Sequence, residues 1–132
     1  MKPWTIVLWL PGFLLRGTKM AKDDYFRIVY LILKILYEYK KKHIPVDIQQ
    51  ISAEALQIEQ GYRDEILGEM LEEGYVKGFN YDMYIAGDIV TELEDIKVTP
   101  KGIEYLQDNN KMKEVAAKIG KAVEKAIIVL IG

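Results

Sequence analysis

Residues 71–76 read LEEGYV and mark the point where the predicted structure changes from helix to strand. Tyr75 and Val76 favour β-structure, whereas the residues before Gly74 continue a helical pattern. Gly74 stands where a helix commonly ends, because glycine adopts the left-handed conformation of a C-cap without strain. The stretch therefore predicts a helix that runs directly into a β-strand.

Three helices are predicted before this junction. The first covers about residues 23–43, where apolar side chains recur every three or four positions, and its wide apolar arc indicates a central core element. A break at residues 44–47 (IPVD) separates it from a short helix at about residues 48–56 and a longer one at about residues 60–73. The inward face of this longer helix is predicted to consist of Tyr62, Ile66, Leu67, Met70 and Leu71.

The residues after the junction predict one long hairpin followed by two helices. Its first strand is expected at residues 75–81, its turn at Gly87-Asp88 and its second strand at residues 96–99. Thr99-Pro100 predicts the start of a short helix, with a capping hydroxyl and a proline at the first helical position. A last helix is expected at residues 111–130.

This order of elements is the winged helix-turn-helix layout, an α+β fold with a three-helix core, a β-hairpin wing and here a C-terminal helical extension. The junction at residues 71–76 and the exit at residues 98–106 (VTPKGIEYL) resemble the YjcQ-like family, small winged-helix proteins of low-GC bacteria and their prophages. The resemblance covers roughly residues 23–132. It implies a fold and a phage-associated origin more than an activity.

The chain is predicted to have three parts, namely an apolar extension (1–19), a winged-helix domain (20–110) and an amphipathic C-terminal helix (111–132). The apolar run at residues 4–15 is shorter than the roughly 20 residues that cross a membrane. Because Met20 opens a sequence typical of a cytosolic protein, we hypothesise that translation starts there. The alternative is that the run covers the core or a membrane-facing patch. A cytoplasmic location without membrane contact is expected.

Composition argues against an enzyme. The 132 residues are 50% hydrophobic and 29% charged, with a net charge of −2 and no cysteine. Disulfides, thiol nucleophiles and thiolate metal sites are therefore excluded. Ser52 and His43 are the only serine and histidine, and Ser52 stands at a predicted helix start, where serine is an ordinary cap. No glycine-rich phosphate loop is present. No catalytic residue, metal, cofactor or small-molecule substrate is predicted.

The charge of the predicted third helix and wing conflicts with DNA binding. Winged helices commonly place the third helix in the major groove, and lysines and arginines supply most of the affinity. Residues 59–95 contain eleven acids against two bases, a local net charge of −9. The hypothesis of a DNA-binding transcriptional regulator therefore relies on five residues: Gln57, Gln60, Tyr62, Arg63 and Lys77.

The alternative hypothesis is a protein-interaction module in which this acidic face meets a basic or polar partner. Tyrosines are favoured anchors at interfaces. The contact residues would be Tyr75, Tyr81, Tyr84, Glu69 and Glu72. The plainest interpretation is that the acids are solvated and the tyrosines pack on the core.

The last predicted helix carries an apolar seam at alternating four- and three-residue spacing, which suits another helix. Its members are Met112, Ala116, Ile119, Val123, Ala126 and Leu130. The seam could form a homodimer with a second copy, or it could lie against the first helix of its own chain.

Overall fold

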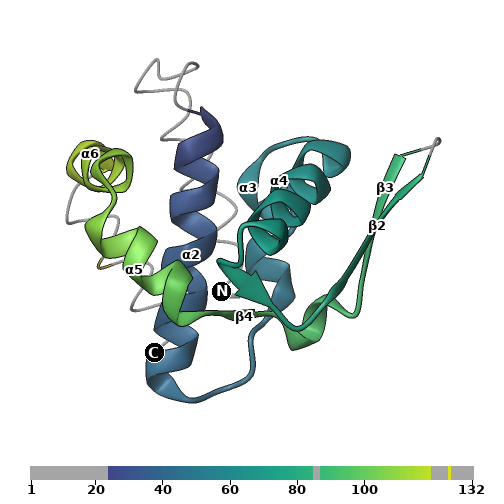
Figure 1. Ribbon diagram of the computed structural model, residues 1–132, viewed down its shortest axis with the longest axis horizontal. Coiled ribbons are helices and arrows are strands. Elements are labelled where there is room, and N and C mark those ends of the chain that lie inside the picture. The colour runs from purple at the N-terminus through teal and green to yellow at the C-terminus, as the bar shows by residue number, and fades with distance from the viewer. Residues whose placement is uncertain (1–23, 85–86, 120–124, 126–132) are drawn as a thin grey trace.

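The chain has an α+β fold of helices and two short antiparallel strand pairs, one of which extends from the helices at the right of Figure 1. The computed structural model describes residues 24–84, 87–119 and 125, although the side chains of Asp24, Tyr84 and Asp88 are not described. The predicted extension (1–19) and the seam residues Val123, Ala126 and Leu130 lie outside the described residues.

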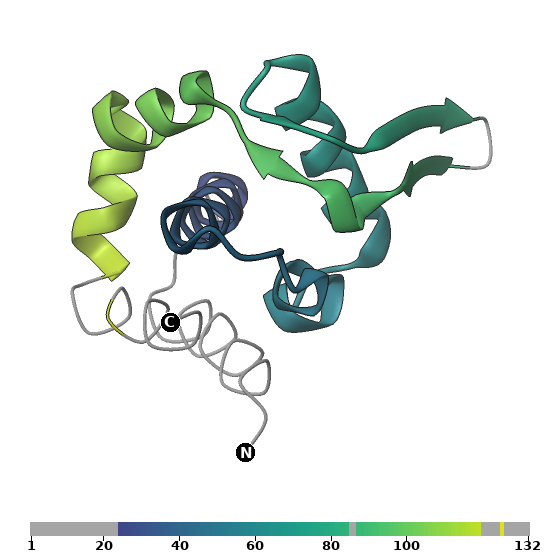
Figure 2. The same cartoon turned by 90° about the horizontal axis from the view of Figure 1, so that it is seen from below.

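Helix α2 (Asp24–Lys42) is the centre of the core, as its wide apolar arc predicted. Ile28, Ile32 and Leu36 are at most 1% exposed. Figure 2 looks along α2 and shows α5 and α6 on one side and the hairpin strands on another. The helix ends at His43, which adopts a φ of 57°. Its N–H donates to the Lys40 carbonyl at 3.2 Å, a contact typical of a helix C-terminus.

The short helix predicted at residues 48–56 is divided in two. A 3₁₀-helix, η2 (Ile48–Ile51), precedes α3 (Ala53–Leu56). Ser52 separates them because it is extended and its Oγ accepts a hydrogen bond from the Ala55 N–H at 3.0 Å. Serine at this position is thus a helix cap, as predicted. The third helix, α4 (Gln60–Glu72), follows at the predicted place.

The single long hairpin of the prediction is divided into two strand pairs. The inner pair joins β1 (Val76–Lys77) to β4 (Lys97–Val98), and the outer pair joins β2 (Asn80–Tyr84) to β3 (Gly87–Thr91). The 3₁₀-helix η3 (Leu93–Asp95) interrupts the return strand between them.

The predicted turn at Gly87-Asp88 is wrong, because a strand already begins at Gly87. Gly87 pairs with Tyr84 of β2 and Asp88 pairs with Met83, so Gly87 and Asp88 already belong to β3, a strand that the prediction missed. Glycine followed by aspartate is typical of turns, and this local preference concealed the strand that begins there.

Thr99 starts α5 (Pro100–Asp108) as predicted, because its Oγ1 accepts a hydrogen bond from the Gly102 N–H at 3.0 Å. The Thr99 hydroxyl also donates to the Gly74 carbonyl, which ties the end of the hairpin to its beginning. In α6 (Asn110–Ile119), Met112 and Ile119 are buried and Ala116 is half-buried. Helix α6 contacts α2 and α5, so this part of the predicted seam is covered by its own chain.

Candidate recognition surface

Helix α4 separates an apolar buried face from an acidic exposed one. Ile66, Leu67 and Met70 are at most 2% exposed and pack into the core. Glu65, Glu69 and Glu72 are exposed, and their spacing of four and three residues places them together on one side of the helix. We name this side the acidic face of α4.

Arg63, a predicted DNA contact, is directed into the protein. It is 8% exposed, and its Nε donates to the Asp64 carboxylate at 2.9 Å. Its Nη1 donates to the Ile51 carbonyl at 3.2 Å. Gln60 completes the group, since its amide nitrogen donates to Asp64 at 3.0 Å. Arg63 therefore fastens the start of α4 to the end of η2.

The other predicted DNA contacts do not gather in one place. Gln57 is exposed at the end of α3, where its φ is 57°, and Tyr62 is half-buried against the core. Lys77 is exposed on β1, beyond the opposite end of α4. A helix of this length spans about 20 Å, so Lys77 is separated from Gln57 and Gln60 by most of the domain.

The outer strand pair lies across α4 and is held there by Tyr81. A Cβ atom added at Gly68 would lie 2.2 Å from the Tyr81 ring, so the absence of a side chain at Gly68 lets this ring pack directly on the helix. Val90, the cross-strand partner of Tyr81, is half-buried on the core as well. Tyr81, a predicted protein contact, therefore acts mainly in packing.

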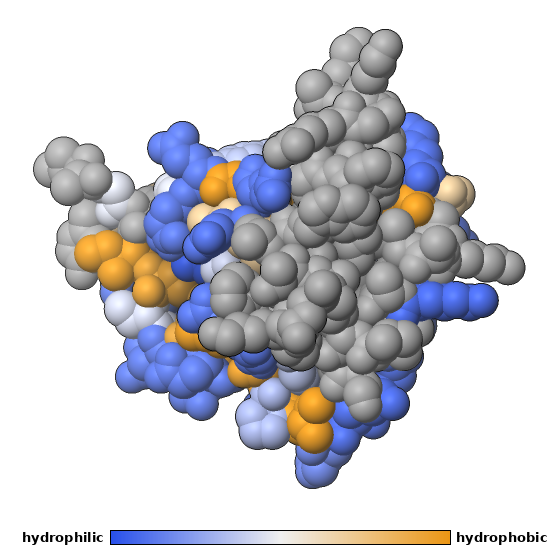
Figure 3. All heavy atoms as spheres, turned by 180° about the vertical axis from the view of Figure 1, so that it is seen from behind, coloured by the Kyte–Doolittle hydropathy of each residue, from blue (hydrophilic) through white to orange (hydrophobic). Residues whose placement is uncertain are grey.

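Beyond Tyr81 the outer pair exposes two apolar side chains. Met83 is 71% exposed and Ile89 is 47% exposed. Figure 3 shows an apolar patch on the hairpin, at the left of that view. Neither residue was predicted as a contact. Strand alternation from Tyr81 and Val90 would have directed Ile89 outward had β3 been recognised, whereas Met83 shares the face of Tyr81, so alternation does not predict its exposure.

Tyrosines border the acidic face of α4 on the side of α2. The Tyr25 hydroxyl donates to the Glu69 carboxylate at 2.9 Å, and burial together with this hydrogen bond raises the pKa of Tyr25. Burial raises the pKa of Tyr75 and of Tyr105, and the charge of Glu73 adds to both effects. Of these tyrosines only Tyr75 was predicted. Glu69, a predicted protein contact, is exposed but already holds Tyr25.

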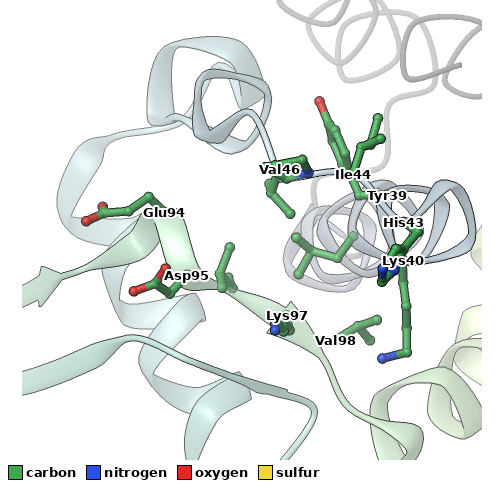
Figure 4. A pocket seen from close by; sticks show the side chains of 12 residues that line it. Tyr39, Lys40, His43, Ile44, Val46, Glu94, Asp95, Lys97 and Val98 are labelled. Carbon is green, nitrogen blue, oxygen red and sulfur yellow. The ribbon is translucent and has the colours of Figure 1, made fainter.

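A cavity of about 450 Å³ lies between the end of α2 and the η3–β4 segment (Figure 4). Lys40 and His43 lie at one end of it, and Glu94 and Asp95 lie at the other. Leu36, Val46, Ile96 and Val98 are among its apolar lining residues. Lys97 also lines the cavity, between these two ends, so charges of both signs are spread along it.

A comparison with family models shows the family to which the chain belongs. The model described as YjcQ protein matches residues 30–125, which is more than half of the chain. The chain belongs to the YjcQ family. The predicted resemblance is confirmed, and the family match includes α4, both strand pairs and α5. No curated protein and no solved structure matches this YjcQ-family chain.

Two features are absent from the described part of this YjcQ-family chain. Residues 24–84, 87–119 and 125 contain no group of three or more His, Cys, Asp or Glu side chains that could hold a metal ion. Within the same residues, no helix is long and apolar enough to cross a membrane.

Proposed function

We propose that this YjcQ-family chain is a non-enzymatic winged-helix module that acts in regulation by binding a basic protein partner. The order of elements supports the fold, with α2, η2–α3 and α4 as the three-helix core and the two strand pairs as the wing. Helices α5 and α6 then form the C-terminal extension. The partner contacts the acidic face of α4 and the outer strand pair.

The burial of Arg63 is the observation that carries this proposal. Arg63 and Lys77 are the only bases between residues 59 and 95, and Arg63 is engaged inside the protein by Asp64 and Ile51. Lys77 is then the one exposed base of this stretch, against the exposed acids Glu59, Glu65, Glu69, Glu72, Glu73, Asp82, Glu92, Glu94 and Asp95. DNA phosphates would meet repulsion on this surface, whereas lysines and arginines of a protein would be attracted.

Met83 and Ile89 supply the apolar contacts that a stable interface needs in addition to charge. Protein interfaces derive much of their affinity from a few apolar or aromatic anchors surrounded by a polar rim. Met83 projects from the side of the outer pair that carries Tyr81, and Ile89 projects from the other side, directly opposite the exposed Asp82. The hairpin therefore offers anchors and the acidic face of α4 offers complementary charge.

The described polar groups support the proposal of a non-enzyme. The only serine hydroxyl, that of Ser52, donates to the Gln49 carbonyl and accepts from the Ala55 N–H. It therefore serves a helix end, and its hydrogen bonds among the described residues are to backbone groups rather than to a base that could activate a nucleophile. His43 directly follows α2, where its left-handed backbone and its N–H bond to the Lys40 carbonyl close the last turn of the helix.

Nuclear magnetic resonance of the full-length, ¹⁵N-labelled chain tests the proposal with two probes at low salt. One is a short peptide of alternating arginine and leucine, and the other is a random-sequence DNA duplex. We expect the peptide to shift amide signals of α4, β2 and β3, and the duplex to leave them unchanged. Shifts of these amides by the duplex alone, disappearing steeply as salt rises, would overturn the proposal in favour of DNA binding.

Variants locate the contact. Met83→Ser and Ile89→Ser should each weaken peptide binding roughly tenfold, because each removes an anchor. Ile44→Ser is the matched control, since Ile44 is 43% exposed and lies next to the end of α2, at a cavity that no residue of the outer strand pair lines. Equal weakening by all three variants would argue against a contact at the outer strand pair.

A further inference from the structure

Tyr75 and Tyr105 form a stacked aromatic pair at the surface. Their ring centroids are 4.3 Å apart and the ring planes differ by 21°. Tyr75 belongs to the junction after α4 and Tyr105 to α5, and both are half-buried. The two rings line an open pocket of about 290 Å³ together with Lys101, Glu104, Asp108 and Asn109. We name this pocket the tyrosine slot.

Carboxylates surround the tyrosine slot. Glu104 and Asp108 are four residues apart on α5, so they lie on the same side of the helix, and both are exposed. Neither forms an ion pair with another of the described residues. The Glu73 charge reaches both rings, where it helps to raise the pKa of Tyr75 and Tyr105. The slot thus combines aromatic faces with a negative potential.

A cation of this chain already lies at the slot. The Lys101 ammonium is 5.7 Å from the centre of the Tyr75 ring, within the distance at which a cation is attracted to an aromatic face. Lys101 is exposed at the first turn of α5, and its long side chain can leave the ring without disturbing the fold. The lysine shows that the ring accepts positive charge.

We propose that the tyrosine slot binds an arginine side chain of the partner protein. A guanidinium group is flat, so it can stack on a tyrosine ring and donate paired hydrogen bonds to a carboxylate, which an ammonium cannot do. Glu104 and Asp108 are the carboxylates that would receive these bonds. Glu73 links the slot to the acidic face of α4, so one partner could contact both. The inference rests on the proposed function for the source of the arginine.

Titration of the full-length chain with N-acetyl-arginine amide tests the slot by nuclear magnetic resonance of the tyrosine rings. The expected result is a saturable shift of the Tyr75 and Tyr105 ring signals. N-acetyl-lysine amide should bind more weakly, and N-acetyl-citrulline amide, which has a similar shape without the charge, should cause no shift. Equal shifts with the citrulline compound, or no ring shift with the arginine compound, would overturn the inference.

Charge variants sharpen this test. Glu104→Gln and Asp108→Asn should each weaken arginine-amide binding by roughly threefold, because exposed charge pairs contribute modestly. Lys101→Gln should strengthen it, since a competing ammonium is removed. Lys113→Gln is the matched control, because Lys113 is an exposed lysine on α6 outside the slot, and it should change nothing. Weaker binding by Lys101→Gln would contradict the proposed geometry.

The two proposals can fail separately. The arginine amide is too small to engage the hairpin, so ring shifts without peptide-induced shifts in β2 and β3 would keep the slot and reject the proposed function. Peptide-induced shifts in β2 and β3 without ring shifts would reject the slot and keep the proposed function.

Discussion

The two strand pairs of the hairpin differ sharply in burial although they belong to one segment of the chain. In the inner pair, Val76 and Val98 lie opposite each other and each is 1% exposed. In the outer pair, Met83 is 71% exposed and Ile89 is 47% exposed. The inner pair therefore joins the helices into one core, and the outer pair presents side chains to solvent.

The neighbours of each pair explain the difference. Strand β1 contacts α4 and β4 contacts α2, so the inner pair lies between helices. The outer pair contacts α4 through the Tyr81 and Val90 side, and its remaining surface faces solvent. Gly78 and η3 separate the two pairs and let the hairpin change direction between them.

We expect the largest loss of stability from Gly78→Ala, at the position that follows β1 of the inner pair. Gly78 has a φ of +94°, and a Cβ atom there would lie 2.1 Å from the Asp95 carbonyl oxygen. Strain and the clash with backbone should together lower the free energy of unfolding by about 3 kcal/mol in urea denaturation. Gly61→Ala is the control, because no atom lies within 4 Å of its added Cβ. It should be neutral or stabilise by about 0.5–1 kcal/mol, and equal losses would contradict the prediction.

Arg63 and Lys77, the two bases of residues 59–95, differ in the same way, because Arg63 is buried and Lys77 is exposed. Arg63→Ala should lower the free energy of unfolding by about 2 kcal/mol, because Asp64 loses its ion pair and the Ile51 carbonyl loses a donor. Lys77→Ala should change it by less than about 0.5 kcal/mol, because Lys77 is exposed. Urea denaturation of both variants checks this. An unchanged stability of Arg63→Ala would show that the side chain is available for contacts outside the protein.

Gly68→Ala tests how firmly the outer pair is held. The added methyl group would displace the Tyr81 ring, which should lower the free energy of unfolding by about 1–2 kcal/mol. In a Tyr81→Ala background the same change should cost almost nothing, since the ring is absent. A double-mutant cycle measured by urea denaturation gives this coupling directly. Additive effects would mean that Tyr81 does not anchor the hairpin on α4.

Local sequence rules predicted the helices well. Apolar periodicity placed α2 and α4, and capping chemistry at Thr99 gave the start of α5. Ser52 was predicted as a cap, although the division of the short helix into η2 and α3 was not predicted. Each of these signals lies within a few residues of the feature that it predicts. For the same reason the predicted junction after Gly74 is confirmed, with a φ of +81° at that glycine.

Features that depend on distant residues were not predictable. Arg63 is buried because the Ile51 carbonyl lies within its reach, and nothing in the spacing of α4 reveals that contact. Tyr75 meets Tyr105 only after the hairpin has returned to the start of α5. The strand β3 was missed because Gly87 and Asp88 have the local preferences of a turn, whereas pairing with β2 decides their conformation. Charge counting nevertheless predicted the acidic character of the candidate surface.

The smallest expected effects on stability are those of substitutions at the exposed apolar residues of the outer pair. Met83→Ser and Ile89→Ser should each change the free energy of unfolding by less than about 0.5 kcal/mol, because both side chains already face water. Val76→Ala and Val98→Ala, in contrast, should each cost about 2 kcal/mol by leaving a gap in the core. Urea denaturation of the four variants measures both pairs on one scale. If the serine variants were as unstable as the alanine variants, the outer pair would belong to the core, and its apolar side chains would not be available to a partner.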